Sequence, residues 1–155
     1  MISPVTTILL LDDDPLLRRA TALILSRQGG LVTPAATGDE AVVLTHEHLY
    51  DVAVFDVSPA GPSAADLLRR IRAGGLVPRR VIAVSNAPLP LAETEELTEV
   101  LLKPYPFESL LHAVFGAGGR PRTRSGVFAR AGSPAGGLTG RAPRGAARAG
   151  RGRAG

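Results

Sequence analysis

Short apolar runs alternate with helix-period segments five times between residues 6 and 115, and this alternation restricts the possible folds more than any other feature. The runs that we predict as strands are Thr6–Leu11, Leu31–Ala35, Val52–Asp56, Val81–Val84 and Val100–Leu102. Short runs without polar alternation are typical of parallel strands that are covered on both faces. Five strand–helix pairs in succession predict a three-layer α/β domain, with a doubly wound parallel sheet and right-handed crossovers.

The segments between these runs carry helix start and stop signals. Three capping patterns predict helix starts: Asp14 before Pro15, Thr37 with Glu40, and Ser63 with Asp66. In the first helix, apolar side chains recur at helical spacing, and we expect such Leu-rich faces to be core; the residues are Leu16, Leu17, Ala20, Leu23 and Ile24. The fourth helix can only be short, over about Ala92–Leu97, because Pro88 and Pro90 block an earlier start. The last helix is predicted to begin near Pro106.

The charges divide the chain into two parts. Residues 1–116 hold nine Lys or Arg and all fourteen Asp and Glu, a net charge of −5, whereas residues 117–155 hold nine Arg and no acid. Gly, Ala, Arg and Pro make up 32 of the 39 residues in the second part. Such a composition buries too little apolar surface to offset the entropy of ordering. We therefore expect one domain over residues 1–116 and a disordered Arg/Gly/Ala-rich tail over residues 117–155.

Composition also bears on location. The chain has no cysteine, which fits a reducing compartment. No signal peptide is evident, and no apolar run approaches the roughly 20 residues that span a bilayer. We expect a soluble, cytoplasmic protein with no membrane span.

Polar side chains follow four of the predicted strands. They are Asp12, Asp13 and Asp14 after the first strand, Asp56 after the third, Ser85 after the fourth and Lys103 after the fifth. Ligands of open parallel sheets bind outside the carboxyl ends of the strands, so these groups should converge. Gathered carboxylates repel one another unless a cation neutralises them, and Mg²⁺ commonly takes one or two carboxylates together with waters and phosphate oxygens. An Asp can also accept phosphate covalently, beside a lysine and a hydroxyl that hold the phosphoryl group.

These motifs resemble the receiver domain of two-component response regulators, of the single-domain chemotaxis type. The matching features over residues 6–115 are Asp12-Asp13 after Ile8-Leu-Leu-Leu, Asp56 closing Asp51-Val-Ala-Val-Phe-Asp, Ser85 closing Val-Ile-Ala-Val-Ser, and Lys103-Pro104. The resemblance implies a flavodoxin-like five-stranded sheet with strand order 2-1-3-4-5. It further implies a phosphorelay function, in which a sensor histidine kinase or His-phosphotransfer protein phosphorylates the chain and a downstream protein, which the sequence does not name, reads the result.

The resemblance assigns a role to each matching residue. Asp56 would be the phosphoacceptor, Ser85 would bind a phosphoryl oxygen and Lys103 would pair with the phosphoryl group. Mg²⁺ would be held by Asp13, Asp56 and the backbone carbonyl of Ser58, with Asp12 holding a metal-bound water. The Lys103–Pro104 peptide would be cis. Such a protein is a phosphoaspartate switch rather than an enzyme with a separate substrate.

Several positions depart from the family pattern. Pro59 stands one place early, and Ala60 and Ala64 replace the usual Pro and Gly, so the turn after Asp56 is altered and the Ser58 carbonyl is a candidate for displacement. Asn86 replaces the usual small residue, which should slow phosphoryl transfer in both directions. Val100 replaces the usual aromatic switch residue. The fourth helix, fifth strand and fifth helix form the usual output face, so signal transmission departs more from the pattern than phosphorylation does.

Other functions remain open at this point. One is a receiver-like interaction module that no longer depends on phosphorylation. A second is non-specific nucleic-acid binding through the Arg-rich tail, which lacks the interleaved aromatics of a stacking platform. A resemblance to haloacid dehalogenase-type hydrolases through Asp12-x-Asp14 is weaker, because only Glu108 follows Lys103 in the folded part. His46 and His48 are expected to be exposed helix residues rather than metal ligands.

Overall fold

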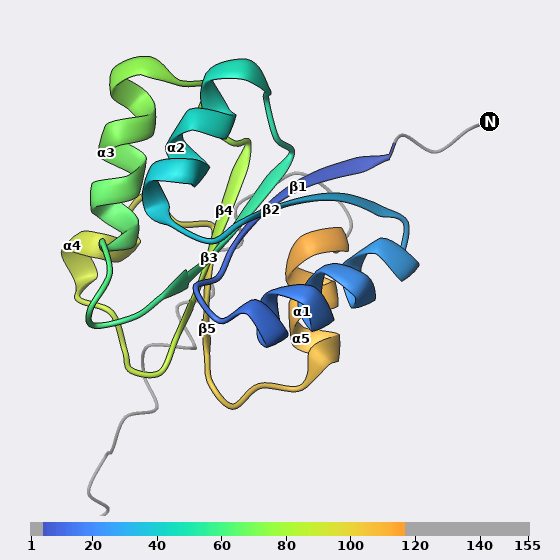
Figure 1. Ribbon diagram of the computed structural model, residues 1–155. Helices are drawn as coiled ribbons and strands as arrows, with labels where there is room; N and C mark the ends of the chain where they lie inside the picture. The colour runs from blue at the N-terminus through green and yellow to red at the C-terminus, as the bar shows by residue number, and fades with distance from the viewer. Residues whose placement is uncertain (1–4, 117–155) are drawn as a thin grey trace, which may run out of the picture.

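Five parallel strands form one sheet in the order β2-β1-β3-β4-β5. The protein is described here by a computed structural model over residues 5–116 (Figure 1). The strands are β1 (Thr6–Leu11), β2 (Gly30–Ala35), β3 (Val52–Val57), β4 (Arg80–Ser85) and β5 (Glu99–Leu102). The helices are α1 (Pro15–Arg27), α2 (Gly38–Glu47), α3 (Ala64–Gly74), α4 (Leu91–Thr94) and α5 (Phe107–Phe115). The predicted three-layer α/β fold and its strand order are confirmed, whereas the disorder predicted for residues 117–155 lies outside the described residues.

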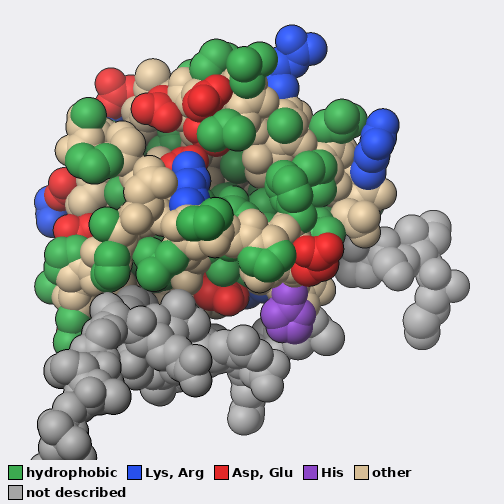
Figure 2. Space-filling model, turned by 90° about the horizontal axis from the view of Figure 1, so that it is seen from below, with side chains coloured by type: hydrophobic (Ala, Val, Ile, Leu, Met, Phe, Trp, Pro, Cys, Tyr) green, Lys and Arg blue, Asp and Glu red, His purple; other side chains and the backbone are tan. Residues whose placement is uncertain are grey.

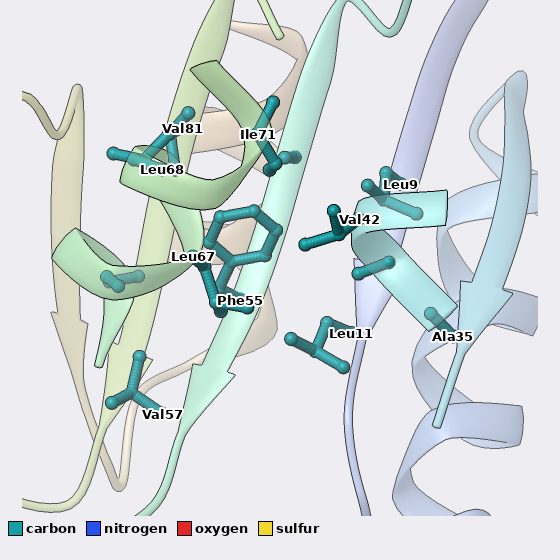
Figure 3. Close-up of a cluster of buried hydrophobic side chains, with 14 of the residues drawn as sticks. Leu9, Leu11, Ala35, Val42, Phe55, Val57, Leu67, Leu68, Ile71 and Val81 are labelled. Carbon is teal, nitrogen blue, oxygen red and sulfur yellow. The ribbon is translucent and has the colours of Figure 1, made fainter. Parts of the chain in front are cut away.

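Helices cover both faces of the sheet, and each face has its own apolar core. Alternate residues of β1 point to opposite sides: Leu9 and Leu11 join the core under α2 and α3, while Ile8 and Leu10 join the core under α1 and α5. Figure 3 shows the first of these cores, with Phe55 of β3 between the helices and the sheet. Burial on both faces explains why the strands are continuously apolar.

The three predicted helix caps are present. The Asp14 carboxylate accepts hydrogen bonds from the N–H groups of Leu16 and Leu17. Thr37 Oγ1 accepts from Glu40 N at 3.2 Å, and Ser63 Oγ accepts from Asp66 N at 3.1 Å. Each cap satisfies backbone donors that the first turn of a helix leaves without an intrahelical partner. These hydrogen bonds fix the residue at which each helix begins.

The predicted apolar face of α1 is wrong, although the helix itself is confirmed. Leu16 is 77% exposed, and Leu17 and Leu23 are also exposed, whereas the only fully buried residue of α1 is Leu25. Apolar residues occur almost all round this helix, so their spacing fits more than one rotation about the helix axis. Packing of α1 against β1 and β2 selects the rotation that buries Leu25.

The fourth helix is short, as the prolines before it predict, but it spans Leu91–Thr94 and so ends three residues before the predicted Leu97. Pro90 occupies the N-cap position of α4, and no side chain caps the helix.

The strands β3 and β4 each end one residue later than predicted, at Val57 and Ser85, and these two residues pair with each other. Within residues 5–116, no helix is long and apolar enough to cross a membrane.

Candidate phosphoacceptor site

The polar residues predicted to converge do lie at one end of the sheet, where the loops after β1, β3, β4 and β5 meet. Figure 2 views this end and shows a basic side chain beside acidic atoms, with hydrophobic side chains around them. Lys103, the only lysine in the chain, donates a hydrogen bond from Nζ to Asp56 Oδ2 at 2.6 Å. Both side chains are partly buried, so this ion pair is less screened than one on the open surface.

The position of Lys103 is set by the sheet and by the loop that follows. Its backbone N–H donates to the carbonyl of Ser85 at 2.9 Å, which ties the end of β5 to the end of β4. The Lys103–Pro104 peptide is cis, as predicted. Burial alone would lower the pKa of Lys103, but the hydrogen bond and charge of Asp56 outweigh it and raise the pKa. The ammonium group therefore stays protonated at neutral pH.

Asp12 is buried and its carboxylate is held in place. Its Oδ1 accepts from Asp14 N at 2.9 Å. Burial raises the pKa of Asp12, with the charges of Asp56 and Asp13 adding to the effect, while the Asp14 N–H and Lys103 oppose it. Burial in the first place, and the neighbouring carboxylates in addition, therefore disfavour the charged form of Asp12.

Asp56 lies between two cavities. One, of about 200 Å³, is also lined by Asp13 and Ser58. The other, of about 430 Å³, is also lined by Asp12, Asn86 and Lys103. The carboxylate therefore faces Asp13 and Ser58 on one side and the lysine ammonium on the other.

The first cavity has a donor set that suits Mg²⁺. Asp13, Asp56 and Ser58 line it, and Mg²⁺ commonly binds one or two carboxylates and keeps several waters. The Ser58 carbonyl accepts from Gly61 N at 3.1 Å, which closes a turn with Pro59 inside it. A carbonyl oxygen has two lone pairs, so this bond leaves one for a metal. In the part of the chain that the structure describes, no three His, Cys, Asp or Glu side chains group closely enough to hold a metal.

Ser85 lies at the site but its hydroxyl is engaged elsewhere. Ser85 Oγ donates to the carbonyl of Ala87 at 2.7 Å and accepts from Ala87 N at 3.2 Å. The side chain is buried and, among the described residues, makes no hydrogen bond to Asp56. Its hydroxyl would have to leave Ala87 to reach a phosphoryl group on Asp56.

Two residues that the sequence did not single out contribute to this site. Arg18 Nη1 donates to the backbone carbonyl of Asp12 at 2.7 Å and so fixes the loop after β1. In the sequence, the only sign that Arg18 could reach the loop after β1 was its position in the first turn of α1. Tyr105 lines the larger cavity, and burial raises the pKa of its hydroxyl. His46 and His48 are exposed, as expected.

A family model described as the response regulator receiver domain matches residues 8–115, which is most of the chain. The chain belongs to this family. The receiver domain is also 30% identical over 127 residues to the transcriptional regulatory protein AfsQ1 of Streptomyces coelicolor. That match covers 79% of this chain and 56% of AfsQ1, so the chain spans little more than half the length of this relative.

Solved structures share the fold of this receiver domain. A response regulator receiver protein from Pseudomonas putida is 25% identical, with a TM-score of 0.63 over 75% of this chain and 100% of that one. A receiver domain from Clostridium thermocellum is 27% identical, with a TM-score of 0.60 over 71% and 91% of the two chains. The Thermotoga maritima response regulator TrrA, solved in complex with Mg(2+)-BeF, is 22% identical, with a TM-score of 0.60 over 71% and 96%.

Proposed function

We propose that this receiver domain is activated when Asp56 accepts a phosphoryl group from a sensor histidine kinase or a His-phosphotransfer protein. The observation that carries the proposal is the 2.6 Å contact between Lys103 Nζ and Asp56 Oδ2, at a carboxylate that also faces Asp13 and Ser58. A carboxylate positioned between a fixed ammonium and a second carboxylate suits covalent phosphorylation better than a structural role, which would need only the ion pair.

The transfer balances without any further reagent. An Asp56 carboxylate oxygen attacks phosphorus, the P–N bond to the donor imidazole breaks, and the imidazole leaves with the bonding electron pair. The Lys103 ammonium is close enough to stabilise the negative charge on the phosphoryl oxygens during the transfer. Mg²⁺, when held by Asp13, Asp56 and the Ser58 carbonyl, would neutralise the remaining phosphoryl charge.

Ser85 would supply the conformational response. Its hydroxyl bonds Ala87 in the described state, and a phosphoryl oxygen on Asp56 would offer a charged acceptor that competes with that carbonyl. The loop after β4 would then rearrange. The domain acts in this proposal as a signalling switch that catalyses its own phosphorylation and dephosphorylation in the cytoplasm and passes the signal to a downstream protein.

Relatives support the proposal. A Burkholderia pseudomallei response regulator was solved with a phosphorylated aspartic acid and a calcium ion, and TrrA was solved with Mg(2+)-BeF. Both are less than 25% identical to this chain, so they show what the shared fold can hold.

Intact mass spectrometry tests the proposal. The full chain incubated with Mg²⁺ and acetyl phosphate should gain one phosphoryl group, Asp56→Asn should gain none, and Asp14→Asn should gain it as the parent does. Asn keeps the cap of α1 in the last variant. A folded chain that remains unmodified, or one that is modified equally in Asp56→Asn, contradicts the proposal.

A second function is favoured by one observation. Val100, at the position where receivers usually carry an aromatic switch residue, is buried in the core, so Ser85 has no aromatic partner there to move with it. If Asp56→Asn and the parent capture the same partner with equal affinity, the domain is an interaction module that does not use phosphate.

A further inference from the structure

The end of the described chain is rich in acidic residues that lack partners. Residues 91–116 contain five Glu and a single Lys or Arg, which is Lys103. Lys103 is engaged by Asp56, and Glu96 forms an ion pair with Arg72 of α3. The other four make no ion pair within residues 5–116; they are Glu93, Glu95, Glu99 and Glu108.

Most acids elsewhere in the described domain are occupied. Three form ion pairs, namely Asp39 with Arg70, Asp51 with Arg79 and Asp66 with Arg69. Glu40 accepts a hydrogen bond at the start of α2, and Asp12, Asp13, Asp14 and Asp56 belong to the phosphoacceptor site and its helix cap. Glu47 of α2 contacts only His48, at 4.0 Å, so outside the phosphoacceptor site most of the unpaired charge lies on α4, β5, α5 and the residues that join them.

The same elements expose apolar surface and an open sheet edge. Leu91 of α4 is 75% exposed and Phe107 of α5 is 48% exposed. Within residues 5–116, β5 is the last strand of the sheet and pairs only with β4, so among these residues its outer edge lacks a strand partner (Figure 1). We name α4, β5 and α5 with these side chains the acidic face. Its mixture of carboxylates and apolar residues suits a partner that is both basic and partly apolar.

The rest of this chain has that composition and leaves from this face. α5 ends at Phe115, where Arg80 donates to the carbonyls of Ala113 and Val114 and fixes the exit point. Residues 117–155 hold nine Arg and no acid, and their adjacent apolar pair Val127-Phe128 lies between Arg124 and Arg130.

The tail is long enough to reach every part of the acidic face. The 12 residue-to-residue steps from Gly116 to Phe128 can span up to about 40 Å when extended. The nine residues of α5 cover only about 14 Å along the helix axis. Attachment to the same chain also gives the tail a local concentration of about a millimolar, which allows weak contacts to be populated.

We infer that residues 117–155 bind back onto the acidic face, with arginines against Glu93, Glu95, Glu99 and Glu108. The inference does not depend on phosphorylation of Asp56. Binding is electrostatic in large part, so it weakens as added salt shortens the Debye length.

Paramagnetic relaxation enhancement tests the inference in the full chain. Because the chain has no cysteine, Ser125→Cys gives a single site for a nitroxide label. At low salt, amide signals of residues 91–111 should broaden more than those of α2 and β2. Near 0.5 M salt, where the Debye length is only about 4 Å, the broadening should largely disappear.

A matched pair of charge variants separates this face from general attraction. Glu95→Gln/Glu108→Gln should weaken the enhancement roughly twofold to fivefold, whereas Glu40→Gln/Glu47→Gln, with the same charge change on α2, should leave it unchanged. Equal loss in both pairs, broadening centred on residues 12–14, or no broadening beyond the residues next to Gly116 would overturn the inference. Contact that persists unchanged at high salt would also overturn it, since salt-insensitive contact is not electrostatic.

Discussion

Asn86 lies beside Asp56, the carboxylate that we propose as the phosphoacceptor. It lines the cavity that contains Asp56 and Lys103, and it also lines a neighbouring cavity beside Ser85. An amide side chain at this point lies where a water molecule or a phosphoryl donor would approach the carboxylate. The prediction that Asn86 slows phosphoryl transfer therefore has a geometric basis in the folded protein.

Asn86→Ala should shorten the lifetime of the acyl phosphate. Removing the amide opens the approach to phosphorus, and we expect faster hydrolysis by a factor of about three to ten, a barrier change of about 1 kcal/mol. Loss of phosphoprotein after removal of acetyl phosphate, followed by intact mass, measures the rate. Equal lifetimes for Asn86→Ala and the parent would show that the side chain does not screen the site.

At the scale of the element, α1 shows that a periodic pattern predicts a helix more reliably than it predicts the buried face. Leu16 and Leu25 are nine residues apart in the same helix, yet one is 77% exposed and the other is fully buried. The two leucines should therefore contribute differently to the free energy of unfolding, because that contribution grows with the apolar area that a side chain removes from water.

Truncating the two leucines to alanine should separate these roles. Leu25→Ala should lower the free energy of unfolding by about 2–5 kcal/mol, as is usual for a buried leucine. Leu16→Ala should change it by no more than about 0.5 kcal/mol, because an exposed side chain leaves no cavity. Urea unfolding followed by circular dichroism measures both, and similar losses would contradict the observed rotation of α1.

The start of α3 carries a pH-dependent contribution to stability. Hydrogen bonding with Ser63, and then with Arg69, lowers the pKa of Asp66 from its ordinary value of 3.8. A carboxyl group whose pKa is lower in the folded state stabilises the fold above its unfolded pKa, and this contribution is lost as the pH falls through the folded pKa.

Asp66→Asn should therefore reduce stability at about pH 7 and have a smaller effect near pH 3. Asn still has a carbonyl acceptor, so the change tests the charge rather than the shape of the first turn. Urea unfolding of both proteins at the two pH values measures the difference. An effect of the same size at both values would exclude the linkage.

At the scale of the whole molecule, the sheet brings together carboxylates that are 44 residues apart in the sequence, such as Asp12 and Asp56. Burial raises the pKa of Asp12, and repulsion by Asp56 adds to this effect. A cation that binds only the folded state should relieve this repulsion and stabilise the domain by mass action.

Mg²⁺ should accordingly raise the melting temperature of the full chain, with a stabilisation of about 2.7 kcal/mol at 100 times the dissociation constant. Asp13→Asn should abolish most of the shift, because Asp13 lines the cavity with Asp56 and Ser58. Asp14→Asn is the matched control: it removes the neighbouring charge, keeps the cap of α1 and should retain the shift. Differential scanning fluorimetry over a Mg²⁺ series measures it, and equal shifts in both variants would rule out the predicted ligand set.

Much of the fold and the residue set of the site were predictable from the sequence. The strands are continuously apolar because they are buried on both faces, and the caps at Asp14, Thr37 and Ser63 are local patterns, so the elements could be placed within a few residues. Asp56 and Lys103 could be paired because carboxyl ends of parallel strands share one edge. The roles assigned to Asp12, Asp13, Ser58 and Ser85 came from family resemblance and stay predictions.

Contacts between distant segments could not be read from the sequence. The direction of the Ser85 hydroxyl toward Ala87, the bond from Arg18 to the Asp12 carbonyl and the exposure of Leu16 depend on how loops and helices pack. The sequence by itself determined the order and type of the elements and the charges at the ends of the strands, because hydrophobic period and capping act over a few residues. Only the tertiary structure decided which side of α1 is buried and which carboxylates face one another, because packing selects among arrangements that local energies leave nearly equal.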